Sequence, residues 1–180
     1  MDDVEPPILG TEPLVVEFAN TLYDGGEDFL GTTELATLWF TTAGAHPARD
    51  TAAAKALRDS IHTLFAATVT GATPPAAAIM HVNTVARHAP TSPQMVWHST
   101  GALVADSRRG AATGDAALLG SLATACIELL TGGQARLLRR CEGSDCCLFF
   151  VQHHPRRRYC HESCAHRDRQ ARYYRRRTAN

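Results

Sequence analysis

Long apolar runs are missing from this sequence. No stretch approaches the roughly 20 consecutive apolar residues that a membrane-spanning helix requires. The opening residues, MDDVEPP, are acidic, whereas a secretory signal begins with a basic segment. We therefore expect a soluble, cytoplasmic protein that does not insert into a membrane.

The usual marks of an active site are missing as well. The sequence shows no nucleophile paired with a base, no glycine-rich loop that would hold phosphate groups and no open metal site. We therefore expect a protein that is not an enzyme. Glu17, Asn20 and Trp97 are candidates for a small-molecule pocket. The alternatives are a local cap or core hydrogen bond for Asn20 and simple packing for Trp97.

Net charge is also absent, but the zero conceals an asymmetry. Residues 136–180 hold twelve arginines against four acidic residues, a formal charge of +8, so the rest of the chain carries −8. Such an asymmetry indicates a segment that meets polyanions, joined to a part that does not. The alternative is that the two parts neutralise each other within the molecule.

Residues 1–135 are predicted to form a mainly helical domain, because apolar residues recur there with helical spacing. Cys126 lies on an apolar stripe and is expected to behave as a small buried hydrophobe, whereas His62 lies off its stripe and is expected on the solvent side. Residues 95–98 and 102–106 alternate as strands do and predict a β-hairpin. The capping residues and stops place the helices at residues 11–24, 33–43, 51–70, 73–89 and 114–131.

Residues 136–180 contain two close pairs of cysteines. Cys141 and Cys146 form a C-x4-C pair, and Cys160 and Cys164 form a C-x3-C pair thirteen residues later. Four thiolates in two pairs suit tetrahedral zinc, which closes a structural site with four sulfur or nitrogen ligands. We therefore predict one structural Zn²⁺, which supplies on the order of 10 kcal/mol of folding free energy to a module too small to fold by burial alone. Disulfides are the alternative for these cysteines.

Other donors lie near the predicted ligands. Cys147 could replace Cys146, and four histidines are further candidates, although the thiolates already complete the shell: His153, His154, His161 and His166.

The run 147–151 is strand-like, and Arg158 and Tyr159 are expected to return as the second strand before a helix that carries the second cysteine pair. This order is treble-clef-like. The predicted fold class is therefore mainly α with a small β-hairpin, with a helical N-terminal domain (1–135) and a C-terminal treble-clef-like zinc finger (136–180). The finger is expected to pack directly on the helical domain, and the helical domain to stay folded without zinc.

The helix after Cys160 is rich in arginine. A rotation of about 100° per residue places Cys164, Ala171 and Tyr174 toward the zinc, with Arg167 beside them, and leaves a basic face opposite. Guanidinium groups bind phosphate in bidentate fashion and can contact guanine, and tyrosine can stack on a base. A solvated basic face is the alternative, and DNA is not distinguished from RNA. The candidate contacts are Arg156, Arg157, Arg158, His166, Arg169, Arg172, Tyr173, Arg176 and Arg177.

The C-terminal residues resemble the CGNR zinc-finger family, whose usual neighbour is the ABATE helical domain. The resemblance rests on Cys141-x4-Cys146, the apolar run 148–151, residues 157–160 (RRYC) and residues 164–167 (CAHR). Tyr159 stands where the family commonly has tryptophan, Gln152 where an acidic residue is usual, and Ala165 and His166 where the family has glycine and asparagine. Near the N-terminus, EFANT is similar to the family's Asp-Phe-x-Asn-Thr signature, with Glu17 in place of aspartate.

The resemblance implies a stress-related transcription regulator of bacteria whose zinc finger binds DNA. We expect its helical domain to sense a small molecule or a partner. Two alternatives remain: a zinc-stabilised module that binds an acidic protein surface, and a small-molecule-binding protein or enzyme with a pocket in the helical domain. The effector and the oligomeric state are left open.

Overall fold

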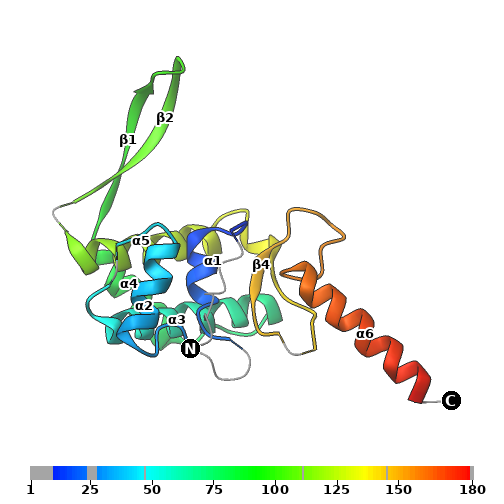
Figure 1. The fold of residues 1–180 in the computed structure, drawn as a ribbon. Coiled ribbons are helices and arrows are strands. Elements are labelled where there is room, and N and C mark those ends of the chain that lie inside the picture. The colour runs from blue at the N-terminus through cyan, green and yellow to red at the C-terminus, as the bar shows by residue number, and fades with distance from the viewer. Residues whose placement is uncertain (1–9, 24–27, 47, 111, 145, 179–180) are drawn as a thin grey trace.

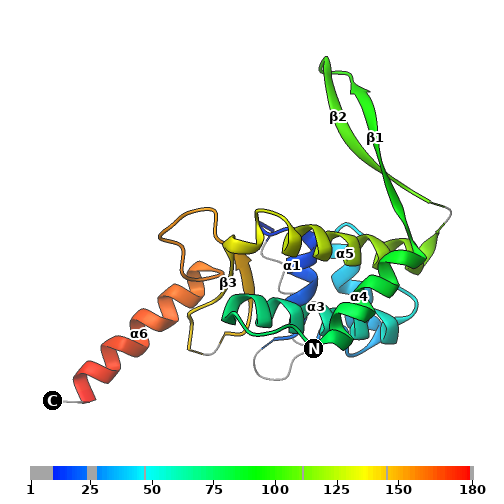
Figure 2. The same ribbon diagram turned by 180° about the vertical axis from the view of Figure 1, so that it is seen from behind.

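The computed structural model describes residues 10–23, 28–46, 48–110, 112–144 and 146–178. Within these ranges the chain forms six α-helices and two small antiparallel hairpins, which confirms the predicted mainly α fold class. Figure 1 shows a helical body from which the first hairpin projects at one end and the last helix at the other. The view from behind in Figure 2 shows the same two projections.

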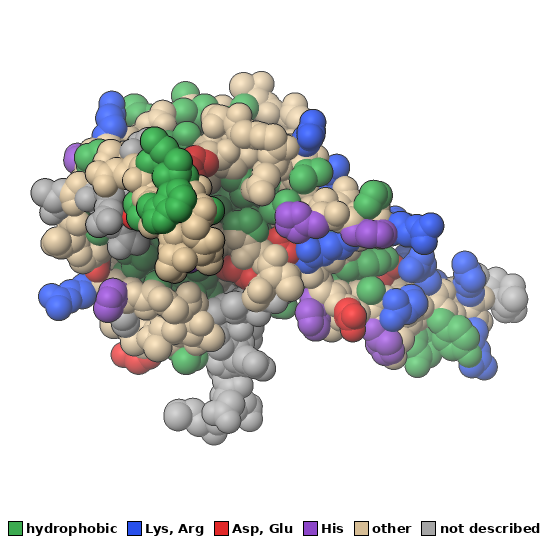
Figure 3. Space-filling model, turned by 90° about the horizontal axis from the view of Figure 1, so that it is seen from above, with side chains coloured by type: hydrophobic (Ala, Val, Ile, Leu, Met, Phe, Trp, Pro, Cys, Tyr) green, Lys and Arg blue, Asp and Glu red, His purple; other side chains and the backbone are tan. Residues whose placement is uncertain are grey.

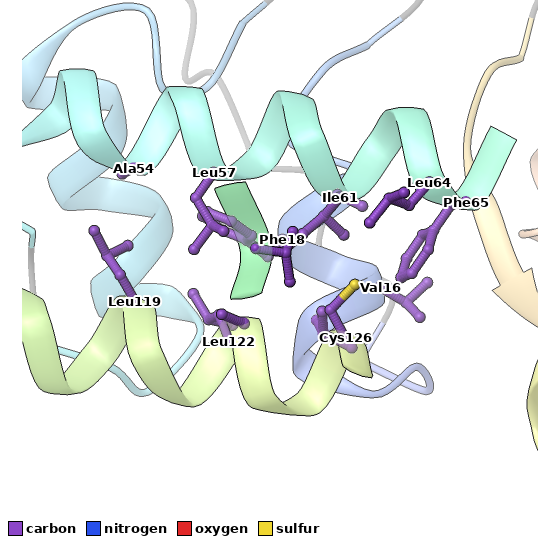
Figure 4. Packing of buried hydrophobic residues seen from close by; sticks show 14 of the residues in the cluster. Val16, Phe18, Ala54, Leu57, Ile61, Leu64, Phe65, Leu119, Leu122 and Cys126 are labelled. Atoms are coloured by element: carbon purple, nitrogen blue, oxygen red, sulfur yellow. The ribbon is translucent and has the colours of Figure 1, made fainter. Parts of the chain in front are cut away.

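Five helices build the body around one apolar core. The long helices α3 and α5 face each other across this core, and α1 packs between them (Figure 4). Leu57, Ile61 and Phe65 of α3 meet Leu122 and Cys126 of α5, and all five are buried. The helices are α1 (Leu14–Ala19), α2 (Thr33–Thr42), α3 (Thr51–Thr70), α4 (Ala76–His88) and α5 (Gly114–Thr131).

Local capping explains why α2 and α3 have the bounds that the sequence predicts. The Thr32 side chain accepts a hydrogen bond from the Leu35 N–H, and the Asp50 side chain accepts one from the Ala53 N–H. Gly71 ends α3 with a φ of 69°, a left-handed conformation that glycine adopts without strain.

The first helix is shorter than the predicted 11–24, since α1 ends at Ala19. The next residue, Asn20, directs its side chain to Phe149 of the C-terminal part, and Leu22 then forms an isolated antiparallel bridge with Asp28. These contacts with distant segments override local helix propensity. The expected glycine stop at 25–26 lies outside the described residues.

The predicted hairpin is confirmed and is longer than expected. It consists of β1 (Thr91–His98) and β2 (Ala102–Arg109), which pair in antiparallel register with Trp97 opposite Leu103. It rises away from the helical body (Figure 1).

By length and composition alone, α5 is apolar enough to cross a membrane, and it is the one such helix in the described part of the chain. A core helix of a globular domain has the same properties, and α5 packs against α1, α3 and α4. Packing in the core therefore explains the apolar side of α5.

The C-terminal part follows a different pairing from the predicted one. The partner of β4 (Phe149–Val151) is β3 (Leu138–Arg140), which follows the short 3-10 helix η1 (Ala135–Leu137). The prediction of a second strand at Arg158 and Tyr159 was wrong, because the strand before Cys141 already occupies that edge of β4. Instead, the Arg158 carbonyl accepts a single hydrogen bond from the Glu142 N–H at 3.1 Å. The final helix, α6 (Glu162–Thr178), projects from the body.

Strand β4 is shared by two cores. Phe149 and Val151 join the core of the helical body, whereas Phe150 and the preceding Leu148 pack with the cysteines. Successive side chains of a strand point to opposite faces, so a strand buried on both sides connects the two apolar clusters. The expected direct packing of the finger on the helical body is therefore observed.

Candidate metal centre and its basic helix

The structure brings together the four predicted zinc ligands, Cys141, Cys146, Cys160 and Cys164. Their sulfur atoms lie within 4.8 Å of one another, and all four residues are buried. The first two come from the turn between β3 and β4, Cys160 lies just before α6, and Cys164 lies in its first turn. All cysteines of the chain are free thiols, so the disulfide alternative does not hold.

The sulfur separations fit a tetrahedral zinc ion. Cys160 Sγ lies 3.7 Å from Cys146 Sγ and 3.6 Å from Cys164 Sγ. Four sulfurs at about 2.3 Å from a central zinc lie about 3.8 Å from each other, whereas a disulfide requires about 2.0 Å. The cluster thus matches one zinc ion held by four thiolates, and a closed set of four sulfurs makes the ion structural.

The electrostatics of the cluster also call for a cation. Hydrogen bonds from the Cys146 and Cys160 thiols lower the pKa of Cys141, so this sulfur ionises first. Hydrogen bonds with Cys141 and Cys146, and after them burial, raise the pKa of Cys160. Four thiolates this close repel one another, and a divalent ion offsets that repulsion.

Neighbouring donors support the sulfurs. The backbone N–H groups of Gly143 and Cys160 donate to Cys141 Sγ at 3.5 and 3.3 Å. A Cβ atom at Gly143 would lie 3.3 Å from that of Cys146, so this tight turn favours glycine. On the other side, Arg167 Nη2 donates to Cys164 Sγ at 3.2 Å. Such second contacts fix the ligands and offset the negative charge of a four-thiolate site.

Cys147 and the histidines do not enter the ligand cluster. The Cys147 thiol instead donates to the Leu22 carbonyl at 3.3 Å. The four histidines of this part of the chain are all exposed: His153, His154, His161 and His166.

Two polar side chains of the N-terminal domain form hydrogen bonds with the backbone of β4. Asn20 donates to the Phe149 carbonyl at 2.9 Å and accepts from the Phe149 N–H at 2.8 Å. Glu12 accepts from the Val151 N–H at 2.7 Å. The backbone of β4 is therefore satisfied on one edge by β3 and on the other by the helical domain.

Arg157 was predicted to contact nucleic acid, but the structure uses it internally. Its guanidinium forms an ion pair with Glu12 at 2.7 Å, and the Glu12 side chain is fully buried. It also donates to the carbonyls of Val151 and Cys160 and lies over the Phe150 ring. Arg157 therefore fastens the loop before α6 to the N-terminal domain, and its contact with nucleic acid stays a prediction.

The remaining candidate contacts divide into paired and open groups. Arg158 pairs with Glu142, Arg172 pairs with Asp168 at 3.0 Å, and Arg177 donates to the Tyr173 hydroxyl at 3.0 Å. The side chains of Arg156, Arg169 and Arg176 form no hydrogen bond or ion pair with any described residue and are exposed, as is His166.

The outer half of α6 is exposed on all sides. Every residue from 172 to 177 is exposed, including Tyr174, which was expected to face the zinc. Tyr174 lies more than two turns beyond Cys164, where α6 has already left the body (Figure 1). Figure 3 shows the arginines distributed along this projecting rod.

The candidate pocket residues do not come together. Glu17 and Asn20 are buried, and Asn20 is occupied by Phe149, whereas Trp97 lies on the projecting hairpin and is 68% exposed. His62, expected on the solvent side, places its ring edge-on to Phe149, 5.0 Å between centroids. The helical domain instead has two adjoining cavities of about 660 and 730 Å³ between α2 with the loop that follows it and the start of α5.

Sequence reasoning missed a buried ion pair. Arg58 is 1% exposed and donates to both carboxylate oxygens of Asp28, at 2.8 and 3.2 Å, and to Thr21. Burial alone raises the pKa of Asp28, but hydrogen bonds from Arg58, Lys55 and the backbone outweigh it and hold the pKa below its ordinary 3.8. The available signal was that Arg58 interrupts the apolar stripe of Ala54, Ile61 and Phe65.

Comparisons with known proteins agree with this division of the chain. The sequence model of the ABATE family, described as "putative stress-induced transcription regulator", matches residues 12–133. The CGNR zinc-finger model matches residues 137–177, which contain all four clustered cysteines. No curated protein matches the chain. Because the first match alone covers more than half of its length, this chain belongs to the ABATE family and carries a C-terminal CGNR zinc finger.

Proposed function

We propose that this protein is a zinc-dependent, DNA-binding transcription regulator that acts in the cytoplasm without catalysing a reaction. The observation that carries the proposal is the projecting outer half of α6, where arginines are exposed on all sides. Zinc fixes the first turn of this helix through Cys164, so its direction relative to the body is set. A rigid basic rod of this kind suits the phosphate groups of a duplex.

The charge distribution supports the same proposal. Residues 136–180 carry a formal charge of +8, and the one ion pair between this part and the N-terminal domain among the described residues is that of Arg157 with Glu12. Most of the positive charge is therefore available to a polyanion.

The test is duplex DNA binding, measured by fluorescence anisotropy at several salt concentrations. Arg169→Gln combined with Arg176→Gln should weaken binding and reduce the slope of log K against log [salt] by about 2, without loss of zinc. The matched control, Arg87→Gln, removes an exposed arginine of the helical domain and should leave the slope unchanged. Absence of binding at low salt would overturn the proposal and favour an acidic protein partner.

We propose further that an effector binds in the cavities between α2 and α5. His46, Arg49 and Asp115 line this region. The Asp115 carboxylate accepts hydrogen bonds from the Arg49 and Asp50 N–H groups, so the two basic side chains suit a small anionic metabolite. Leu118 lines both cavities, and Leu118→Trp should fill them. Carboxylate and phosphate metabolites that raise the melting temperature of the wild type should fail to do so in this variant. If none stabilises the wild type, the sensing part of the proposal is lost while DNA binding stands.

A further inference from the structure

The β1–β2 hairpin has one apolar face. In its register Trp97 lies opposite Leu103 and Met95 opposite Ala105. Residues directly opposite in an antiparallel pair share a face, and residues two apart along a strand share it too. These four residues, Met95, Trp97, Leu103 and Ala105, therefore form one surface, here called the apolar hairpin face.

The other face of the hairpin is mixed, because half of its residues between 94 and 106 are polar. It carries the pairs of Gln94 with Asp106 and His98 with Ala102, together with Val96 and Val104. The hairpin is thus amphipathic, as a strand pair is when one side is covered. A fully solvated hairpin gains no free energy from gathering its large apolar side chains on one face.

The apolar hairpin face is nevertheless exposed in the single chain. Met95 is 77% exposed, Trp97 68% and Leu103 62%. Figure 3, which looks down on the hairpin, shows hydrophobic side chains gathered there. Together they expose on the order of 500 Å², near the upper end of the largest patch found on ordinary monomers. An isolated two-stranded hairpin is marginally stable in water, so this face needs a cover.

We infer that a second copy of this chain covers it, with the apolar hairpin faces of two protomers packed against each other. A two-fold contact requires a surface that complements itself, and none of the four residues of the apolar hairpin face is charged, so this strip brings no like charges together. The charged register position in the same series, Arg109, lies at the base of the hairpin, four residues beyond Ala105. The contact would bury roughly 1,000 Å² in total, the area at which specific interfaces begin. A second copy carries the same uncharged strip, and it is present in every solution of the protein.

The position of the hairpin is compatible with the rest of the molecule. Figures 1 and 2 show the hairpin and α6 projecting from different ends of the body. Dimerisation through the hairpin therefore leaves the zinc centre and the basic helix accessible. The inference stands independently of DNA binding.

Analytical ultracentrifugation of the full-length zinc protein tests the inference. The wild type should sediment as a dimer, twice the chain mass of 19.5 kDa. Trp97→Ser combined with Leu103→Ser should raise the dimer dissociation constant more than ~30-fold, because a central tryptophan is a typical hot spot. The matched control, Val104→Ser on the opposite face, should remain dimeric. Zinc content and far-UV circular dichroism report whether each variant is folded.

A second measurement needs no variant. Trp39 is fully buried, so acrylamide quenching of tryptophan fluorescence reports mainly on Trp97. Quenching should increase when the wild type is diluted through its dissociation constant. A wild type that remains monomeric at ~100 µM, or a double variant that is folded and still dimeric, would overturn the inference. Binding of a monomeric wild type to lipid vesicles would assign the face to a membrane surface instead.

Discussion

The side-chain amide of Asn20 forms two hydrogen bonds with the backbone of Phe149, a residue 129 positions further along the chain. Both partners are buried, and the bonds replace the ladder partner that β4 lacks on that edge. An asparagine is suited to this role because its amide donates and accepts at once. The first helix thereby holds the central strand of the zinc finger.

Asn20→Ala should destabilise the protein by about 2–4 kcal/mol, because it leaves the buried N–H and carbonyl of Phe149 without partners. Urea unfolding followed by far-UV circular dichroism measures this change. Asn83→Ala, which removes the same side chain from an exposed position on α4, should change the unfolding free energy by less than about 0.5 kcal/mol. Equal effects of the two changes would contradict the role assigned to Asn20.

Cys160→Ser should abolish stoichiometric zinc binding, since it removes one of four ligands, and metal analysis of the purified protein measures this loss. Cys126→Ala provides the control, because Cys126 is buried in the helical core and should not alter zinc content.

The zinc-free variant should also lose stability in the helical domain. The sequence suggested that this domain stays folded without zinc, but Phe149 and Val151 complete its core from the finger side. The melting temperature followed at the α-helical signal should therefore fall. A Cys160→Ser variant whose helical domain melts as in the wild type would show that the two cores are separable.

Arg156 and Arg157 are adjacent but should behave differently. Arg157→Gln leaves the carboxylate of Glu12 buried without its cation and should destabilise the fold by about 3 kcal/mol. Arg156→Gln should leave stability unchanged and lower the salt slope of DNA binding by about 1. Unfolding and anisotropy measurements on both variants check the contrast, which fails if the two changes have the same effect.

Asp28 should make the free energy of unfolding depend on pH in the acid range. Its pKa in the folded state is held below the ordinary 3.8, so the folded state favours the carboxylate. Its contribution is therefore fully present above about pH 4 and is lost as the pH falls through the folded-state pKa. Asp28→Asn should cost about 2 kcal/mol at pH 7, and its difference from the wild type should narrow progressively below pH 4.

The control for this prediction is Asp59→Asn, which removes the other carboxylate near Arg58. Asp59 is about half exposed, so its loss should cost less than about 1 kcal/mol. Since zinc ligands also protonate in acid, the comparison is made as the difference between variant and wild type at each pH. A difference that stays constant down to pH 2 would contradict the assignment.

The parts of this protein that were predictable from sequence are those with local signals. The zinc ligands are recognisable because two cysteine pairs with short spacings need no knowledge of the rest of the fold. Helix α3 is likewise set by Asp50 at one end and Gly71 at the other. Each of these features depends on residues within a few positions of each other.

What escaped prediction depends on contacts across the chain. Nothing near Arg157 distinguishes it from Arg156, because its partner Glu12 lies at the other end of the sequence. The pairing of β3 with β4 was missed because residues 138–140 are too few to show alternation. Asn20 belonged to a recognisable motif, but its purpose became visible only with Phe149 beside it.

Strand β4, three residues long, has a consequence for how this finger can be used. Fingers strung on flexible linkers can be exchanged between proteins like modules, since each carries its own complete interior. Here, a truncation just before η1 would remove Phe149 and Val151 from the core of the helical domain and leave an apolar cavity there. The excised finger would expose the same two side chains to solvent. The two domains should therefore be expressed and engineered as one unit.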